Sequence, residues 1–524
     1  MSQSEYTALP RQEEIEIDSA TNAIGSVSSR SSLDSLVLPP PPPPSLWRVA
    51  ANKVQKILVP SFLQRDDSEE DGPGQSGTRQ TGSRRISTDW LDGLRGVASF
   101  FVFLFHHTMY GHPGLLWGYG APGENKHLVM QLPFIRLIVH GRAMVAIFFV
   151  ISGYALSFSP LKFIHKKDHG TLLKRLSSSV FRRGMRLAIP SFTSLFLHYL
   201  AHITNISPKR HKGSTLKSDT KHLLHDIDRI VNPFTLVTTS GGFHFNGHLW
   251  TIPIEFRGSM ILFVTILGLS RCRAWVRMVT VACLCTYFMA KEQWNTALFL
   301  AGMVVAESNL LLLSEPAAGE SGSSSSSNIN SSDTERTWTE DFDLEKAPGK
   351  IPWYRKISSK AQKAGRKAGL IFILILGLYV LSFPNKGAES TPGWMWMASL
   401  FKDNPGYAVN VWVSIGSTTV VWAISFIKGC QGVLETRLIN YMGKISFSLY
   451  LVHGLGNQFI GKPLIDFMWN NFTGREPGFW KECSWLFAIA LYIPILIWLA
   501  DIFWRLVDAP SVTFAKMVEG KCFG

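Results

Sequence analysis

Three ionisable side chains with helical spacing lie in the first long apolar segment of the chain. Arg95 and His106 are eleven residues apart, close to three helical turns, so they share one helix face about 16 Å apart along its axis. Asp92 stands three residues before Arg95, a spacing at which the two can pair. Imidazole titrates near neutrality, so a neutral His106 can act as a general base. Packing with a hydrogen bond to another helix explains His106 equally well, and the spacing leaves both readings open.

Two later apolar segments also carry polar side chains that have either substrate-binding or structural roles. They are Trp250, Glu255, Ser446, Tyr450 and His453. An interfacial position also accounts for Glu255, because it stands near the start of a span. Ser446 and His453 are seven residues apart and therefore lie on the same face of a helix.

The composition indicates an integral membrane protein. Of the 524 residues, 46% are hydrophobic and only 17% are charged, whereas soluble domains average about 25% charged. The net charge of +14 does not point to nucleic acid, because the basic residues stand beside apolar spans, as membrane topology requires. The six cysteines show no zinc-binding or disulfide spacing, and no metal is expected.

We predict an all-α membrane fold of about ten transmembrane helices, since a bilayer core about 30 Å thick needs roughly 20 apolar residues per helix. The predicted spans are Leu91–Tyr110, Phe134–Phe158, Leu187–Ile203, Trp250–Leu269, Val276–Ala290, Trp294–Leu313, Ala368–Phe383, Ala408–Ile427, Leu438–Ile460 and Trp485–Leu506. Together they form one domain over residues 89–510.

Two long segments outside the spans are predicted to be polar and disordered. Residues 1–88 form a tail without the apolar core of a signal peptide, and residues 314–367 form a Ser-rich loop. A short tail follows at 511–524. The run Pro39–Pro44 is extended, and it acts either as a stiff spacer or as a docking site for a proline-reading partner.

Lysine and arginine set the predicted orientation. Basic residues gather before the first span and after the second, fourth and sixth, which places both termini in the cytosol. The pattern does not indicate which organelle's membrane holds the protein. The loop 204–247 is an exception, because it holds several lysines on the opposite side. Its histidines and Asp226 have a loose spacing for metal ligands, and a solvated loop is the favoured reading.

Several segments, in this order, resemble the motifs of acyltransferase family 3, the ten-helix membrane acyltransferases. Leu91–Ala98 with His106 matches its L-D-G-x-R-G-x-A opening, and Phe148–Tyr154 matches F-F-V-x-S-G-[FY]. Arg182–Pro190 is similar to its R-R-x-x-R stretch followed by proline, and Ile445–His453 to I-S-[YF]-S-x-Y-L-x-H. The segment from Trp250 departs from the W-S-x-x-x-E of bacterial members and looks like the fungal branch.

The resemblance implies transfer of an acyl group, commonly acetyl, from cytosolic acyl-CoA to a hydroxyl or amine of a glycan, lipid or secondary metabolite. By the same resemblance His106 is the general base, supported by Arg95 and Asp92. Arg182, Arg183 and Arg186 would hold the CoA phosphates, which suits guanidinium chemistry. Acyl-CoA is then a co-substrate, and no permanently bound cofactor is expected.

Two other classes of function fit the same pattern of helices. A transporter also places charged residues inside a bundle, although the two halves of this chain show no repeated hydropathy pattern. A non-catalytic sensor would use the proline-bearing tail and the Ser-rich loop to recruit cytosolic partners. Both would tolerate loss of the His106 imidazole better than an acyltransferase.

Overall fold

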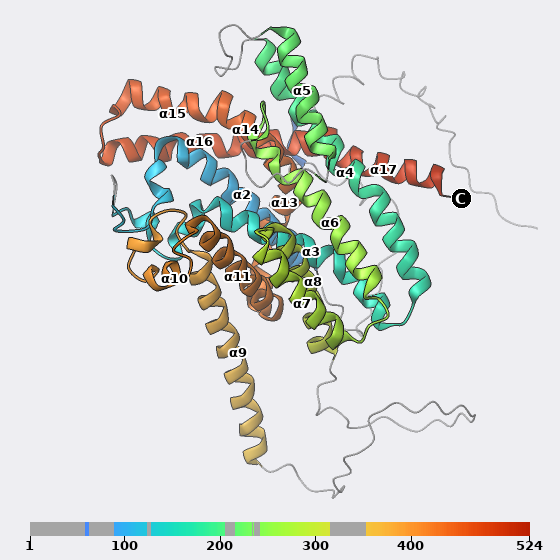
Figure 1. Ribbon diagram of the computed structural model, residues 1–524. Coiled ribbons are helices and arrows are strands. Elements are labelled where there is room, and N and C mark those ends of the chain that lie inside the picture. Colours follow the sequence, from blue (N-terminus) through green and yellow to red (C-terminus); the bar gives the residue numbers. More distant parts are fainter. Residues whose placement is uncertain are drawn as a thin grey trace, which may run out of the picture. The chain divides into compact units, whose positions relative to one another are not determined.

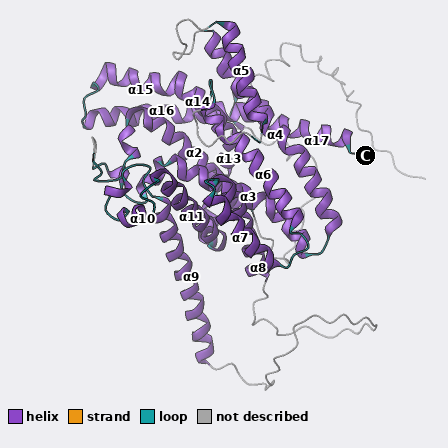
Figure 2. Ribbon diagram, viewed as in Figure 1, coloured by secondary structure: helices purple, strands orange, loops and turns teal. Residues whose placement is uncertain are grey.

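The computed structural model describes residues 58–61, 88–122, 127–204, 215–232, 234, 242–314 and 353–523. Their regular elements are helices joined by loops (Figure 2). Most of the predicted tail 1–88 and the larger part of the predicted loop 314–367 lie outside the described residues. Leu58 and Ser61, from the predicted tail, pack on the helix that begins at Phe479: Trp498 Nε1 donates to Leu58 O at 2.7 Å, and Ser61 N donates to Asp501 Oδ2 at 3.0 Å.

The longer helices are named here as in Figure 1. The first group is α2 (Asp89–Gly111), α3 (Gly141–His165), α4 (His169–Ile203), α5 (Leu216–Val231), α6 (Thr251–Gly268), α7 (Ala274–Ala290) and α8 (Trp294–Ser314). The second is α9 (Trp353–Leu381), α10 (Met395–Ser399), α11 (Pro405–Phe426), α12 (Lys428–Leu434), α13 (Arg437–Lys444), α14 (Ser446–Gly456), α15 (Lys462–Met468), α16 (Phe479–Phe503) and α17 (Ala509–Cys522).

Six helical segments are long and apolar enough to cross a bilayer, and α7 is a shorter apolar helix. The six are Gly141–His165, Gly247–Gly268, Trp294–Leu312, Ala364–Leu381, Pro405–Phe426 and Phe479–Cys522. Each of the ten predicted spans overlaps a helix. The first lies in α2, where the polar residues that suggest chemistry also lower the mean hydropathy.

Close packing of α3 on α8 forms the centre of the main apolar core. Two glycines permit it. A Cβ atom on Gly302 would overlap the carbonyl oxygen of Val150, and one on Gly153 would overlap that of Phe299. Small residues let helix backbones approach in this way inside membranes, where van der Waals contact drives association.

The second span starts later than predicted. Phe134 has a positive φ of 66°, and the residues after it form a 3-10 turn up to Val139. His140 then caps α3, since its Nδ1 accepts from Ala143 N at 3.0 Å and its Nε2 donates to Phe383 O at 2.9 Å. The apolar run therefore includes a loop, in which Leu137 and Val139 are buried by packing and Phe134, Ile135 and Ile138 are exposed.

The basic segment between the second and third spans is a helix, not the predicted loop. Asp168 caps α4 by accepting from Thr171 N at 3.0 Å, and α4 then continues without a break for 35 residues. Charge excludes this stretch from the bilayer core but does not oppose helix formation, because Lys and Arg are good helix formers.

Three more boundaries differ from prediction. The ninth span is interrupted at Ile445, between α13 and α14, and its second part continues through α15 to Thr473. The tenth continues through α17 to Cys522, so residues 511–522 of the predicted tail are helical, and Arg182 on α4 pairs with Glu519 of α17 at 3.0 Å. Helix α9 begins at Trp353, inside the predicted disordered loop, and its N-terminal half stands clear of the other helices (Figure 1).

The predicted solvated loop 204–247 contains the amphipathic helix α5, which packs on α4. The carboxylate of Asp226 is fully buried and accepts hydrogen bonds from the backbone N–H groups of His244 and Phe245, at 2.9 to 3.1 Å. Burial raises the pKa of Asp226, and these hydrogen bonds offset part of the rise. Asp226 therefore fixes the segment that leads from Phe243 into α6.

Replacing Gly302 by alanine should destabilise the protein, because the added methyl group meets backbone atoms of α3 that cannot rotate away. Overpacking of this kind costs about 1–3 kcal/mol, which should appear as a lower melting temperature in detergent. Gly268→Ala is the matched control, since nothing lies within 4 Å of a Cβ there. Equal melting temperatures for the two variants would contradict the proposed close contact.

Replacing Asp226 by asparagine should loosen the segment 243–247. An amide has one accepting oxygen, so part of the three-bond network is lost, at a cost of about 1–3 kcal/mol. Hydrogen exchange of the amides of His244 and Phe245 should speed up by tenfold or more. Asp228→Asn, at an exposed site on the same helix, should leave their exchange unchanged.

Candidate active site

A polar cavity of about 300 Å³ opens between α2, α3, α4, α6 and α14. Its charged lining residues are mostly basic: Arg95, Arg183, Arg186 and Lys444 against Glu255 and Asp508. Apolar side chains, among them Phe148 and Leu187, form the rest of the wall. The cavity therefore combines an excess of positive charge with an apolar lining.

Arg183 is held in place by α6. Its guanidinium donates to Glu255 Oε1 at 2.7 Å and to Ser259 Oγ at 3.0 Å. Arg186, three residues further along α4, is exposed in the cavity and has no ion-pair partner among the described residues. A guanidinium fixed by an ion pair and an exposed one thus face the same space.

The structure separates two of the predicted site residues from this cavity. Asp92 pairs with Arg95 at 3.1 Å, as the spacing predicts, but does not line the cavity. Arg182 also lies outside the lining, where it pairs with Glu519. Of the three arginines of the basic motif, only Arg183 and Arg186 face the cavity.

Three histidines from three elements meet deeper in the bundle. His106 comes from α2, His248 from the 3-10 turn before α6, and His453 from α14; their ring nitrogens lie within 4.8 Å of one another. The ring centroid of His248 lies 4.2 Å from that of His106 and 4.4 Å from that of His453. We call this set the histidine cluster. A metal ion could in principle draw such nitrogens together.

Tyr450 lies between the cavity and the histidine cluster. Its side chain lines the cavity, and its hydroxyl donates to the carbonyl oxygen of His248 and lies 2.7 Å from Thr251 Oγ1. Its own carbonyl oxygen accepts from His453 Nδ1 at 2.6 Å. One residue thus contacts both sites.

Of the remaining predicted residues, one lines the cavity and one does not. Ser446 is buried and lines the cavity, whereas Trp250 packs among apolar side chains outside it. Sequence reasoning gave His248 no role. The available signal was its position directly before the Leu249-Trp250 pair of a recognised motif, but its partners lie far away in the chain.

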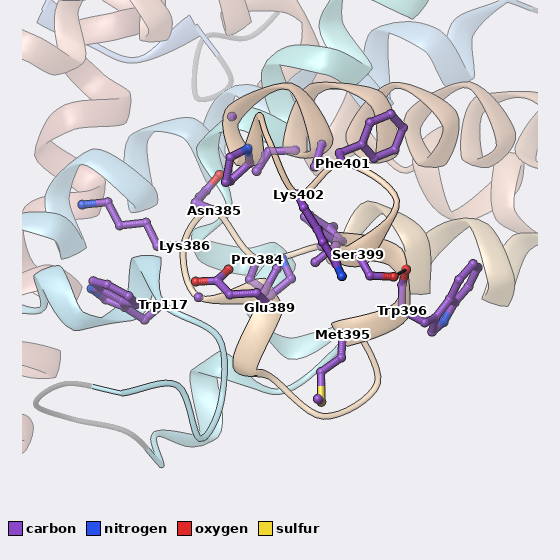
Figure 3. A pocket seen from close by; sticks show the side chains of 18 residues that line it. Trp117, Pro384, Asn385, Lys386, Glu389, Met395, Trp396, Ser399, Phe401 and Lys402 are labelled. Atoms are coloured by element: carbon purple, nitrogen blue, oxygen red, sulfur yellow. Dashed lines mark hydrogen bonds between the residues drawn. The ribbon is translucent and has the colours of Figure 1, made fainter.

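A larger cavity, of about 770 Å³, contains none of the predicted site residues (Figure 3). It is formed by the segment from Phe383 to Val409 together with Trp117, and Figure 3 shows Lys402 and Glu389 among its side chains. Trp117 follows the C-terminal end of α2, so this cavity lies at the end of that helix opposite Arg95. Size alone therefore does not identify the chemical site.

Comparison with known proteins agrees with the motifs. A family model described as an acyltransferase domain matches residues 88–505. O-acetyltransferase PaAT-1 of Phomopsis amygdali is 28% identical over 461 residues, covering 82% of this chain and 84% of that protein. Acyltransferase clz18 of Cochliobolus lunatus is 23% identical over 488 residues, covering 81% of this chain and 94% of that protein. No solved structure matches the chain.

The match covers most of the described helices and includes both the basic cavity and the histidine cluster. The resemblance drawn from the motifs is confirmed, and the apolar helices agree with a membrane protein. The chain therefore belongs to acyltransferase family 3 and is an acyltransferase.

Proposed function

We propose that the protein transfers an acetyl group from acetyl-CoA to a hydroxyl group of a glycan, lipid or secondary metabolite. The observation that carries the proposal is the basic cavity, which Tyr450 joins to the histidine cluster. The name of the relative PaAT-1, an O-acetyltransferase, supports acetyl as the group and oxygen as the acceptor atom.

The basic cavity suits the phosphates of the donor. Arg183 and Arg186 on α4, with Arg95 and Lys444, place four cations around one opening. Guanidinium groups bind phosphate oxygens in a two-pronged geometry. From Arg95, eleven residues of α2 rise about 16 Å to His106, a length that suits the pantetheine arm of CoA.

His106 would act where the thioester meets the acceptor. It takes the proton of the acceptor hydroxyl as the oxygen attacks the thioester carbonyl carbon, and a C–O bond forms. The C–S bond then breaks, and the leaving thiolate takes the proton from the imidazolium to give free CoA. General base catalysis of this kind contributes about 10²- to 10⁴-fold.

The topology proposed for this reaction has ten spans, with both termini in the cytosol. Four segments (α2, α4, α7 and α13–α15) would add to the six that meet the length and hydropathy limits. The basic half of α4 and the tail before α2 would face the cytosol, where acyl-CoA is available.

Replacing His106 by alanine should lower acetyl transfer by at least about 100-fold, because the acceptor proton loses its base. The measurement uses membranes with the full-length chain, labelled acetyl-CoA, and an extract of cells in which the gene is disrupted as the source of acceptor. His107→Gln is the matched control. His107 is the next residue on α2, bonds Asn457 instead, and should keep activity within a few-fold. Equal transfer by wild type and His106→Ala would remove His106 from the mechanism.

Replacing Arg186 by glutamine should raise the KM for acetyl-CoA by about tenfold, the loss of one charge-assisted hydrogen bond. The kcat should change little, since Arg186 would contact the donor phosphates and not the reacting atoms. Lys174→Gln removes the same charge from an exposed site on α4 and should leave the KM unchanged. An unaltered KM in Arg186→Gln would place the phosphates elsewhere.

A further inference from the structure

His453 is a buried histidine whose second ring nitrogen has no use in the fold. The residue is 0% exposed, and its Nδ1 lies 2.6 Å from the carbonyl oxygen of Tyr450. A carbonyl oxygen only accepts hydrogen bonds, so Nδ1 must carry the ring hydrogen. The neutral ring therefore has its lone pair on Nε2.

That lone pair is buried and unsatisfied. Nε2 of His453 makes no hydrogen bond to any residue that the structure describes. An unpaired buried polar atom costs free energy, so its presence calls for a functional reason. The neighbouring side chains that such an atom could serve are His106 and His248: one ring nitrogen of each of the three histidines lies within 4.8 Å of the other two.

The local backbone maintains this arrangement. Gly454 follows His453, and a Cβ atom there would lie 2.9 Å from Cδ2 of His248 and 3.3 Å from Nε2 of His198. A side chain at this position would push those rings away. The hydrogen bond from the Tyr450 hydroxyl to the carbonyl oxygen of His248 fixes the backbone that carries the His248 ring.

We propose that His453 is a positioning residue that accepts a hydrogen bond from protonated His106 through Nε2, directly or through one water molecule. The proposal rests on the proposed function. The ring centroids of His106 and His453 lie 5.3 Å apart, and the ring planes are stacked at 27°. Imidazole nitrogens form hydrogen bonds in the ring plane, so a direct bond requires one ring to turn out of the stack, whereas a single bridging water joins the nitrogens without this change. His248 packs against both rings and keeps them facing each other.

The proton balance is complete. The acceptor O–H bond breaks and its proton moves to His106, which becomes an imidazolium in a water-poor interior. There a lone pair from His453 stabilises the new positive charge, which burial otherwise penalises. When the C–S bond breaks, the proton leaves His106 for the thiolate, and His453 returns to its starting state unchanged.

Two variants test this role in the full-length protein in membranes, with acetyl-CoA and the extract described above. His453→Gln should lower kcat at least about tenfold, while the KM for acetyl-CoA stays within twofold because the donor cavity is untouched. In His453→Ala, added imidazole should restore activity. Pyrrole, which has the same shape and an N–H group but no basic lone pair, should not. His169→Gln, an exposed histidine on α4, is the control for histidine loss.

The outcomes separate the two proposals. Wild-type kcat in folded His453→Gln would overturn the role of His453 and leave the acyltransferase proposal intact. Recovery of His453→Ala with both compounds, or with neither, would assign His453 to packing. One equivalent of zinc bound to wild type but not to His453→Gln would make the cluster a metal site and overturn the proposal. A wild-type protein without acetyl transfer would overturn the proposed function and this inference with it.

Discussion

The hydrogen bonds of Tyr450 connect two regions that would otherwise be independent. Its hydroxyl group ties α14 to the turn before α6, and its carbonyl oxygen sets the tautomer of His453. The side chain of this residue lines the basic cavity, and its carbonyl oxygen holds one ring of the histidine cluster. In the proposed reaction, the donor phosphates and the reacting thioester need sites of different character, a charged opening and a buried cluster. Tyr450 contacts both.

Inside the bundle, most charged groups occur with a partner, since an isolated ion there is costly. Arg277 and Glu307 are both nearly inaccessible and pair with each other, and His165 also reaches Glu307. This network ties α7 and α3 to α8 away from the cavity. Arg186 is different, because it faces the cavity without an ion-pair partner among the described residues. Arg136 is a second exception, because it is buried outside the cavity and two of its guanidinium nitrogens have no hydrogen-bond partner among the described residues.

Much of the site follows from local spacing. The face shared by Arg95 and His106 depends only on helix geometry, and the pairing of Asp92 with Arg95 does too. His248 could not be predicted in the same way, because its neighbours come from α2 and α14 and only the tertiary packing brings them together. Arg182 looks equivalent to Arg183 in the motif, yet it forms an ion pair with Glu519 of α17 instead. The helix at 353–367 was missed because polar composition was taken for disorder, and the helix at 511–522 because the segment was taken for a short tail.

The length of α4 links distant parts of the bundle. At 35 residues it measures about 52 Å, against a hydrocarbon thickness of about 30 Å. It carries the cavity arginines near its middle and contacts α5 near its far end. Because the basic half and the apolar half form one continuous helix, a tilt of about 5° about its middle would move each end by about 2 Å in opposite directions and leave the cavity arginines almost in place. The end that contacts α5 and the end at His169 are therefore mechanically coupled through the helix.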